Sequence, residues 1–200
     1  LTGGQATEFE SALRVGESFG NCDHAMARRS LQRTAASGDF PGRQHHRAFE
    51  RKLVTPSRWD KFLSGDSAAM TAAERQGLRA FLNAGCQACH LGAYVGGDRF
   101  MKAGLVNAWF SQADSGRYAV TKNATDLFLF KVPSLRNIEK TGPYFHDGSV
   151  ANLGEAVRLM AHHQLGKALA PAEVESIVTW LGALTGELPL QYIAFPQKPK

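Results

Sequence analysis

One short motif, Cys86-Gln87-Ala88-Cys89-His90, constrains the fold more than any other feature of the sequence. This C-x-x-C-H pattern is typical of c-type haem attachment, because two thiols three positions apart reach both vinyl groups of one porphyrin. The adjacent histidine is then held under the iron as the proximal ligand. We therefore predict one covalent haem c, bound through Cys86 and Cys89, with His90 on the iron. In so small a domain the haem would fill much of the core.

Two other uses of the motif are open from the residues alone: a redox-active cysteine pair and one half of a zinc site. A structural zinc site needs a second ligand pair at a related spacing, and the third cysteine, Cys22, has no other cysteine near it. Three cysteines also do not make a disulfide framework. We predict that Cys22 is a free or buried thiol.

The residues alone leave the sixth ligand of the iron open. The downstream candidates are the methionines and histidines Met101, His146, Met160, His162 and His163. A methionine on a helix face is more often a core residue than a ligand. Met160 shares the apolar face of its expected helix with Leu153 and Val157. A thioether ligand would raise the haem potential, which suits an electron relay.

Charge and composition narrow the choice of partners. The 200 residues carry a formal net charge of +5, and 44% of them are hydrophobic. No Lys/Arg run dominates the charge, so we expect no nucleic-acid partner. A mildly basic surface suits an acidic redox partner, although solubility alone would explain it. No apolar stretch approaches the length of a membrane span, and we expect any signal peptide before Leu1 to have been removed.

Hydrophobic periodicity predicts an all-α fold of the cytochrome c type with long irregular loops. Capping boxes at residues 7–10 and 71–74 would open two helices, the second of which leads to Cys86. Pro171 is favourable in the first turn of the last helix. Little periodicity is present in residues 91–148, where the run 127–132 is the one candidate for an extended segment. The expected helices cover residues 7–20, 23–38, 71–85, 153–160 and 171–186. Two more are expected between them, one that ends before Pro56 and one whose apolar face carries Trp59, Phe62 and Leu63.

From about Ala48 onward the sequence resembles the second half of bacterial di-haem cytochrome c peroxidases and of their methylamine-utilisation relatives. The matching segments are residues 48–56, 58–66, 86–90, 130–137, 141–149 and 153–166. The run Thr-Gly-Pro-Tyr-Phe-His-Asp-Gly-Ser at residues 141–149 is as specific as the haem motif. The resemblance covers most of the chain.

The resemblance implies an electron-transfer role. His90 and Met160 would be the axial ligands of the family's high-potential haem, which accepts electrons from a small cytochrome c or a cupredoxin. A periplasmic location follows from the family and from where c-type haem is attached. A homodimer is a further candidate assembly.

Four other residues gain roles from the resemblance. The carbonyls of Thr141 and Pro143 would help to hold a calcium ion, although the residues alone favour a tight Gly-Pro turn without an ion. Arg136 and His146 would lie near the haem edge. The alternative for both is ordinary hydrogen bonding within loops.

The predicted organisation is an atypical N-terminal arm over residues 1–47 and a c-type cytochrome domain over residues 48–200. A complete family member has a first haem domain before the segment at Ala48, where peroxide is reduced, and no C-x-x-C-H motif is found in residues 1–47. Peroxide reduction needs an iron with an open or openable position. We therefore expect this chain to carry single electrons without turning over peroxide well.

Three hypotheses follow for the function. The first is the electron-accepting domain of a bacterial cytochrome c peroxidase. The second is a stand-alone monohaem electron carrier, or a subunit of a larger redox complex, in which residues 1–47 form a docking arm. The third is a ligand sensor in which Met160 leaves the iron easily.

Overall fold

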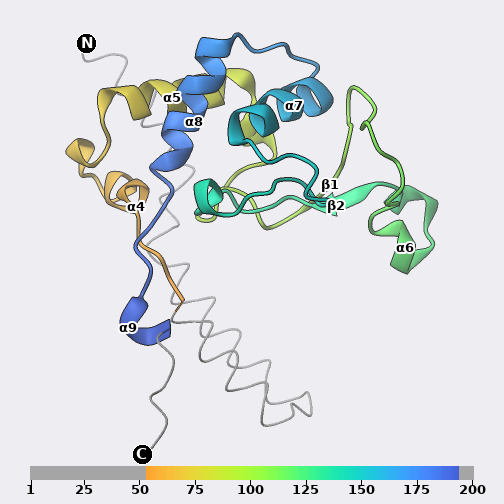
Figure 1. The fold of residues 1–200 in the computed structure, drawn as a ribbon, viewed down its shortest axis with the longest axis horizontal. Helices are drawn as coiled ribbons and strands as arrows, with labels where there is room; N and C mark the ends of the chain where they lie inside the picture. Colours follow the sequence, from red (N-terminus) through yellow and green to blue (C-terminus); the bar gives the residue numbers. More distant parts are fainter. Residues whose placement is uncertain (1–52, 194–200) are drawn as a thin grey trace, which may run out of the picture. The chain divides into compact units, whose positions relative to one another are not determined.

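The computed structural model describes residues 53–193, and the account below is limited to them. The helices, labelled as in Figure 1, are α4 (Arg58–Leu63), α5 (Ala72–Ala84), α6 (Tyr118–Thr121), α7 (Leu153–Leu165), α8 (Pro171–Gly182) and α9 (Leu190–Ile193). Short 3-10 turns lie between them: η2 (Ser67–Ala69), η3 (Cys86–Ala88), η4 (Ala124–Asp126) and η5 (Ile138–Lys140). The arm predicted over residues 1–47, with its two expected helices and Cys22, lies outside the described residues. The helix expected to end before Pro56 is wrong over residues 53–56, which are not helical, whereas the next expected helix is present as α4.

Helix α5 begins and ends at the signals that the sequence carries. The Thr71 hydroxyl accepts a hydrogen bond from the Glu74 backbone N–H at 3.2 Å, and the Glu74 carboxylate accepts one from the Thr71 N–H at 2.8 Å. This reciprocal pair satisfies two backbone donors that a helix start would otherwise leave free. Gly85 ends the helix in the left-handed region, with φ at 94°. The predicted capping box is confirmed, and the helix delivers the chain directly to Cys86.

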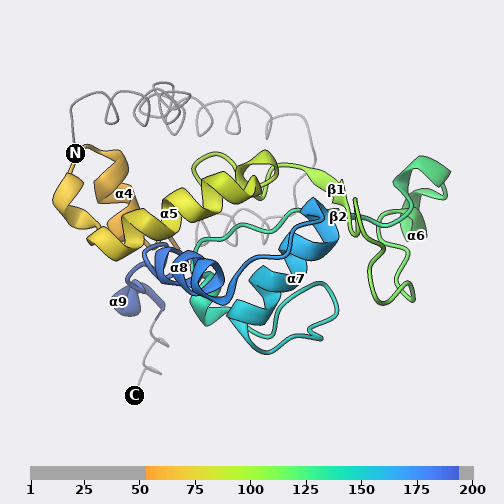
Figure 2. The ribbon, with the colours of Figure 1, turned by 90° about the horizontal axis from the view of Figure 1, so that it is seen from above.

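Helices α5 and α8 cross in close contact, as Figure 2 shows. Gly77 of α5 makes this approach possible, because a Cβ atom there would lie 2.9 Å from Trp180 Cβ and inside contact distance of the Ser176 carbonyl. The ring of Phe81 packs on that of Trp180, with centroids 4.5 Å apart. The buried residues Leu78, Ile177, Leu181 and Leu184 complete the core around this crossing. The helix before the haem motif therefore packs across the last long helix.

Helices α7 and α8 match the sequence pattern with two adjustments. Helix α7 begins after Asn152, whose side chain accepts from the Glu155 N–H at 3.0 Å, and runs on to Leu165, beyond the expected residue 160. Helix α8 has Pro171 in its first turn, as predicted, but ends at Gly182, before the expected residue 186. The segment after it forms an antiparallel bridge between Gly186 and Ser57. This bridge ties the start of the described chain to its end.

The prediction of a purely α-helical fold is wrong in one region. Strands β1 (Phe100–Lys102) and β2 (Leu129–Lys131) form a two-stranded antiparallel sheet, in which Met101 pairs with Phe130. The run at residues 127–132 indicated one extended segment, but its partner strand carries no comparable signal. A hydrogen-bonded partner distant in sequence is needed to satisfy such a strand, and local patterns do not report it. The fold is therefore mostly helical, with a small sheet and irregular loops.

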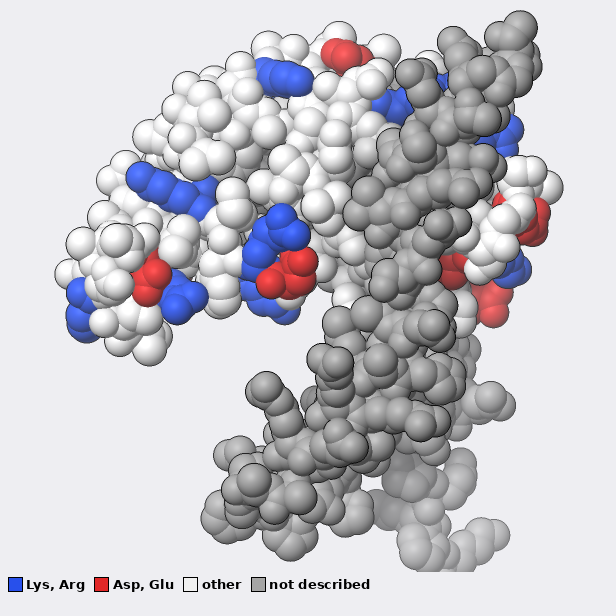
Figure 3. Space-filling model, turned by 180° about the vertical axis from the view of Figure 1, so that it is seen from behind, with Lys and Arg blue, Asp and Glu red and all other residues white. Residues whose placement is uncertain are grey.

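Two features of the surface bear on partners. None of the helices within residues 53–193 is long and apolar enough to cross a membrane. On the face drawn in Figure 3, basic and acidic side chains are interspersed, with no large single-sign patch.

Candidate functional site

The C-x-x-C-H motif forms one tight turn at the end of α5. Residues Cys86–Ala88 make the 3-10 turn η3, and the backbone N–H groups of Cys89 and His90 both donate to the Cys86 carbonyl, at 3.2 and 3.1 Å. Both cysteines are partly buried, and neither is in a disulfide. The turn therefore presents two thiols and one imidazole from five consecutive residues, which is the donor set that haem c requires.

The Cys86 thiol differs from the reactive thiol of a redox pair. Burial raises the pKa of the Cys86 thiol to about 11, although its own backbone and Lys167 act in the opposite direction. Redox-active C-x-x-C pairs depend on a thiol whose pKa is lowered. Within the described residues, no group of three or more His, Cys, Asp or Glu side chains could hold a metal ion. Covalent haem stays the prediction for this motif.

The His90 imidazole is partly buried beside backbone carbonyls. Burial lowers the pKa of its imidazole, although hydrogen bonds to the carbonyls of Val95 and Pro133 act in the opposite direction. Its Nδ1 atom lies 3.3 Å from the Val95 carbonyl oxygen. A histidine that ligates a metal through one ring nitrogen typically donates the other N–H to such a carbonyl, which fixes the ring and raises its basicity. Nε2 is the nitrogen left for the iron.

Gly96 approaches the His90 ring at the same nitrogen, Nδ1. Its φ is 117°, and a Cβ atom there would lie 3.1 Å from His90 Nδ1 and inside contact distance of the Pro133 carbonyl. A left-handed conformation and a close backbone approach both select glycine. This residue was not identified from the sequence, where the Gly96-Gly97 pair was the only local signal.

The candidates for the sixth ligand occupy different environments. Met160 is half-buried on α7, His162 is exposed, and Met101 is half-buried in β1. His163 is 7% exposed, with Nδ1 3.1 Å from the Asn107 carbonyl and its ring 4.8 Å from that of Trp109. His163 is therefore a hydrogen-bonded core histidine. Met160 stays the predicted ligand.

Residues 105–110 cover one side of α7 with apolar side chains. The backbone N–H groups of Val106 and Asn107 donate to the His163 carbonyl at 3.0 and 3.1 Å. Leu105, Val106 and Phe110 are nevertheless more than half exposed. Met160 and His163 are three residues apart and share a helix face. Large exposed apolar side chains beside that face are the kind of surface that a porphyrin buries.

Trp109 adds a polar group to the same region. It is 7% exposed, and its indole N–H has no acceptor among the residues that the structure describes. Its ring lies edge-on to that of Phe145, with centroids 4.7 Å apart. A buried donor without a partner costs free energy unless a ligand or water satisfies it. The two thiols and the imidazole of the motif are the groups that fit a haem, whereas the unpaired N–H is shared with the buried Trp59 and Trp180 and does not point to one ligand.

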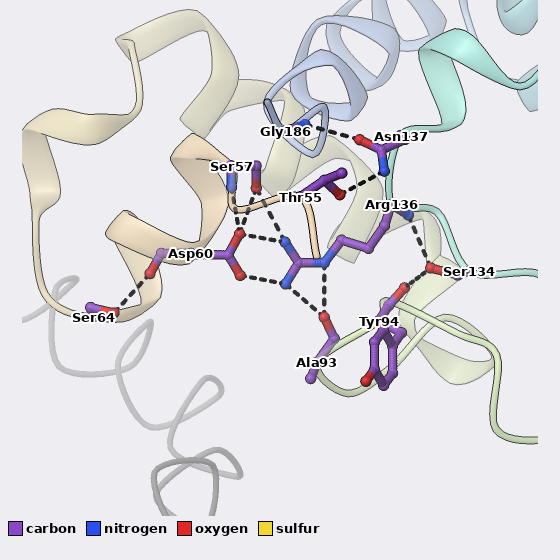
Figure 4. A network of polar contacts seen from close by, with 10 residues as sticks. All are labelled: Thr55, Ser57, Asp60, Ser64, Ala93, Tyr94, Ser134, Arg136, Asn137 and Gly186. Carbon is purple, nitrogen blue, oxygen red and sulfur yellow. Dashed lines mark hydrogen bonds and ion pairs between the residues drawn. The ribbon is translucent and has the colours of Figure 1, made fainter. Parts of the chain in front are cut away.

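The structure places Arg136 in a network within the protein, drawn in Figure 4. Its guanidinium donates to both carboxylate oxygens of Asp60, at 2.8 and 2.7 Å, and to the Ser57 hydroxyl at 3.1 Å. The remaining N–H groups donate to the Ala93 carbonyl at 2.9 and 2.7 Å. All five donors therefore have protein partners, which corresponds to the loop hydrogen bonding that was the alternative. Contact with a haem carboxylate stays a prediction.

The other residues singled out by the resemblance lie in one loop. His146 is exposed, and its ring stacks on that of Phe130 with centroids 4.1 Å apart. Thr141 and Pro143 are also exposed, in the turn after η5. The Gly142–Pro143 peptide bond is cis. The tight Gly-Pro turn expected from the residues is present, and a calcium ion at these carbonyls stays a prediction.

Comparison with known proteins shows which family the chain belongs to. No family model matches the chain. It is 44% identical over 155 residues to cytochrome c551 peroxidase of Pseudomonas aeruginosa, covering 74% of this chain and 45% of the relative. It is 45% identical over 143 residues to cytochrome c551 peroxidase of Nitrosomonas europaea, covering 70% and 43%. It is also 31% identical over 155 residues to methylamine utilization protein MauG of Methylorubrum extorquens, covering 77% and 38%.

A solved structure agrees with these relatives. A MauG-like protein associated with microbial copper homeostasis superposes with a TM-score of 0.56 at 25% identity, covering 72% of this chain and 51% of that one. The chain spans less than half the length of the curated relatives it matches. The shared region includes the haem motif, whose geometry is described above. The chain therefore belongs to the bacterial di-haem cytochrome c peroxidase family.

Proposed function

We propose that this chain is the electron-accepting haem domain of a cytochrome c peroxidase. Cys86 and Cys89 would hold one haem c through thioether bonds, with His90 and Met160 as its axial ligands. The observation that supports this most is the single C-x-x-C-H turn, whose histidine lies with Nδ1 3.3 Å from a backbone carbonyl oxygen. The bound haem would supply one-electron oxidation and reduction.

The chain's own residues would set the properties of that haem. The Val95 carbonyl raises the basicity of His90, which favours the oxidised iron, whereas a thioether ligand favours the reduced iron. If His90 and Met160 both hold the iron, no position would be left on it for peroxide. The domain would store and pass single electrons, and peroxide would be reduced at a second haem elsewhere in the complete protein.

The electron donor we propose is a small cytochrome c or a cupredoxin in the periplasm. The formal net charge of +5 suits a donor with an acidic face. Arg136 and His146 are proposed near the haem edge, and the carbonyls of Thr141 and Pro143 are proposed to hold a calcium ion. A homodimer is proposed as the assembly. Calcium is tested by comparing thermal unfolding of the holoprotein with and without a chelator, and the dimer by the mass of the holoprotein in solution.

The ligand assignment is tested by Met160→Ala, with Met101→Ala as the matched control. In the holoprotein, Met160→Ala should remove the thioether from the iron, lower the reduction potential and let carbon monoxide bind the reduced haem. Met101→Ala should leave the spectrum and the potential unchanged, because that side chain lies in strand β1. An unchanged axial spectrum in Met160→Ala would show that Met160 is a core residue and that the ligand lies elsewhere.

A second candidate function is a stand-alone monohaem electron carrier. It is favoured by the presence of one C-x-x-C-H motif in the sequence. The intact mass of the protein from its source, with haem counted per chain, separates the two. One haem on a chain of 21.7 kDa supports the carrier, and two haems on a much longer chain support the peroxidase domain.

A further inference from the structure

The Arg136 guanidinium joins α4 to the loop that follows the haem motif, as Figure 4 shows. On one side it forms a two-pronged ion pair with Asp60 in α4, and Ser57 bonds to the same carboxylate at 2.8 Å through its hydroxyl. On the other side it donates twice to the Ala93 carbonyl. Ala93 is only three residues after His90. A charge-assisted pair with this geometry is stronger and more directional than a neutral hydrogen bond.

The residues around Arg136 hold three successive carbonyls of that loop. The Ser134 hydroxyl donates to the Tyr94 carbonyl at 2.6 Å, and the Leu135 N–H donates to the Val95 carbonyl at 3.2 Å. Arg136 itself holds the carbonyl of Ala93. The orientation of each peptide group in residues 93–95 is therefore set by a segment about forty residues later in the chain.

The loop needs this support because its backbone is not in a relaxed conformation. Val95 has φ at 51°, in the left-handed region, which is a strained conformation for a β-branched residue. Such conformations persist when the surroundings over-determine them, and they are concentrated at functional sites. Here the strained residue supplies the carbonyl that faces His90 Nδ1 at 3.3 Å. A small rotation of this peptide group would lengthen that contact and weaken it.

The partly buried position of the Arg136–Asp60 ion pair allows it to hold the loop at residues 93–95 in place. The Arg136 side chain is 16% exposed and that of Asp60 is 40% exposed, so the guanidinium lies inside the fold with its partner at the rim. All five N–H groups of Arg136 are in use. Lysine offers a single ammonium and cannot reproduce this planar arrangement.

We propose that Arg136 is a positioning residue for the haem ligand: through Ala93 and its neighbours it orients the Val95 carbonyl, which holds the His90 imidazole. This inference rests on the proposed haem-binding function. Weakening the ion pair should loosen the carbonyl, reduce the basicity of His90 and raise the reduction potential. Outer partners of metal ligands change affinity or activity by about ten- to a hundredfold when they are altered. A tenfold change in the equilibrium constant for one-electron exchange corresponds to about 59 mV.

The test compares four variants of the holoprotein. Asp60→Asn removes the charge of the partner while leaving Arg136 in place, and Arg136→Lys keeps the charge but loses the planar donors. Ser134→Ala removes an independent hold on the same loop. The control is Asp126→Asn, which breaks the Arg117–Asp126 pair (3.2 Å) in the part of the chain that carries α6. The reduction potential is measured by optical titration, and solvent exchange of the His90 Nδ1 proton is measured by NMR.

The expected result is a raised potential and faster exchange of the Nδ1 proton in Asp60→Asn, Arg136→Lys and Ser134→Ala, with both quantities unchanged in Asp126→Asn. If Arg136→Lys alone shifts the potential, Arg136 acts directly on the haem and the inference is wrong. Lower stability without any shift in potential would show a purely structural role and also overturn it. If Arg136→Lys does not fold, the other two variants still decide the question. Absence of covalent haem from the unaltered chain would contradict the proposed function instead.

Discussion

Replacing Gly77 by alanine is expected to separate helices α5 and α8. The new Cβ atom would lie 2.9 Å from both the Ser176 carbonyl carbon and Trp180 Cβ, and closer still to the Ser176 carbonyl oxygen. Two of these atoms are backbone, so they cannot move aside by a change of rotamer. Overpacking of this kind typically lowers the free energy of unfolding by about 1–3 kcal/mol. Because the backbone here is rigid, we expect a loss at the upper end of that range.

A second effect of the same substitution acts in the opposite direction. Alanine is favoured over glycine within a helix by about 1 kcal/mol. The net loss in the free energy of unfolding is therefore about 2 kcal/mol. For a chain of this size that corresponds to a fall in Tm of roughly 4–8 °C.

The matched control is Gly182→Ala at the end of α8. A Cβ atom there would have one neighbour within 4 Å, the Glu139 carboxylate at 3.9 Å, so the substitution should be neutral or stabilising by about 0.4–1 kcal/mol. Thermal unfolding of both holoproteins is followed by far-UV circular dichroism. Equal Tm values for the two variants would refute the close contact of α5 and α8 at Gly77.

Three further predictions concern the supports of the haem motif. Thr71→Ala should lower the free energy of unfolding by about 1 kcal/mol, because the cap of α5 is lost; urea denaturation measures this, and no change would contradict the capping role. Burial tends to raise the pKa of Asp60, but the Arg136 and Ser57 hydrogen bonds hold the pKa below its usual value. The stability that this carboxylate provides is therefore present above about pH 4 and is lost at lower pH. The stability difference between the native protein and Asp60→Asn should therefore shrink as pH falls below that value, and a constant difference would be inconsistent with the ion pair. Gly96→Ala should displace His90 and reduce the fraction of chains that carry haem, counted by intact mass. Gly65→Ala is the control, because Gly65 has a similar positive φ but no neighbour within 4 Å, and it should leave that fraction unchanged.

The parts of the structure that the sequence predicts are those that depend on neighbouring residues. The cap at Thr71, the turn of the haem motif and the first-turn proline of α8 each involve residues no more than four positions apart. Their physical cause is local, because a helix start leaves backbone donors that a nearby side chain can satisfy. The apolar spacing of α5 similarly predicts which face is buried.

The parts that the sequence does not predict depend on contacts between distant residues. Strand β1 is an example, because only its pairing with β2 makes it a strand. The partners Arg136 and Asp60 are 76 positions apart, and neither belongs to a pattern that indicates the other. The left-handed conformation of Val95 is also invisible in the sequence, because valine rarely adopts it.

This division has a consequence for how haem proteins of this kind are interpreted. The C-x-x-C-H motif identifies the cofactor, because attachment chemistry is local. If His90 binds the iron as proposed, the Val95 carbonyl and the distant residues that hold it would tune the potential of the haem. Two chains with the same motif would then differ in potential through a change at Asp60 or Arg136. The motif predicts that the chain carries electrons. We expect the long-range contacts to set the reduction potential at which it carries them.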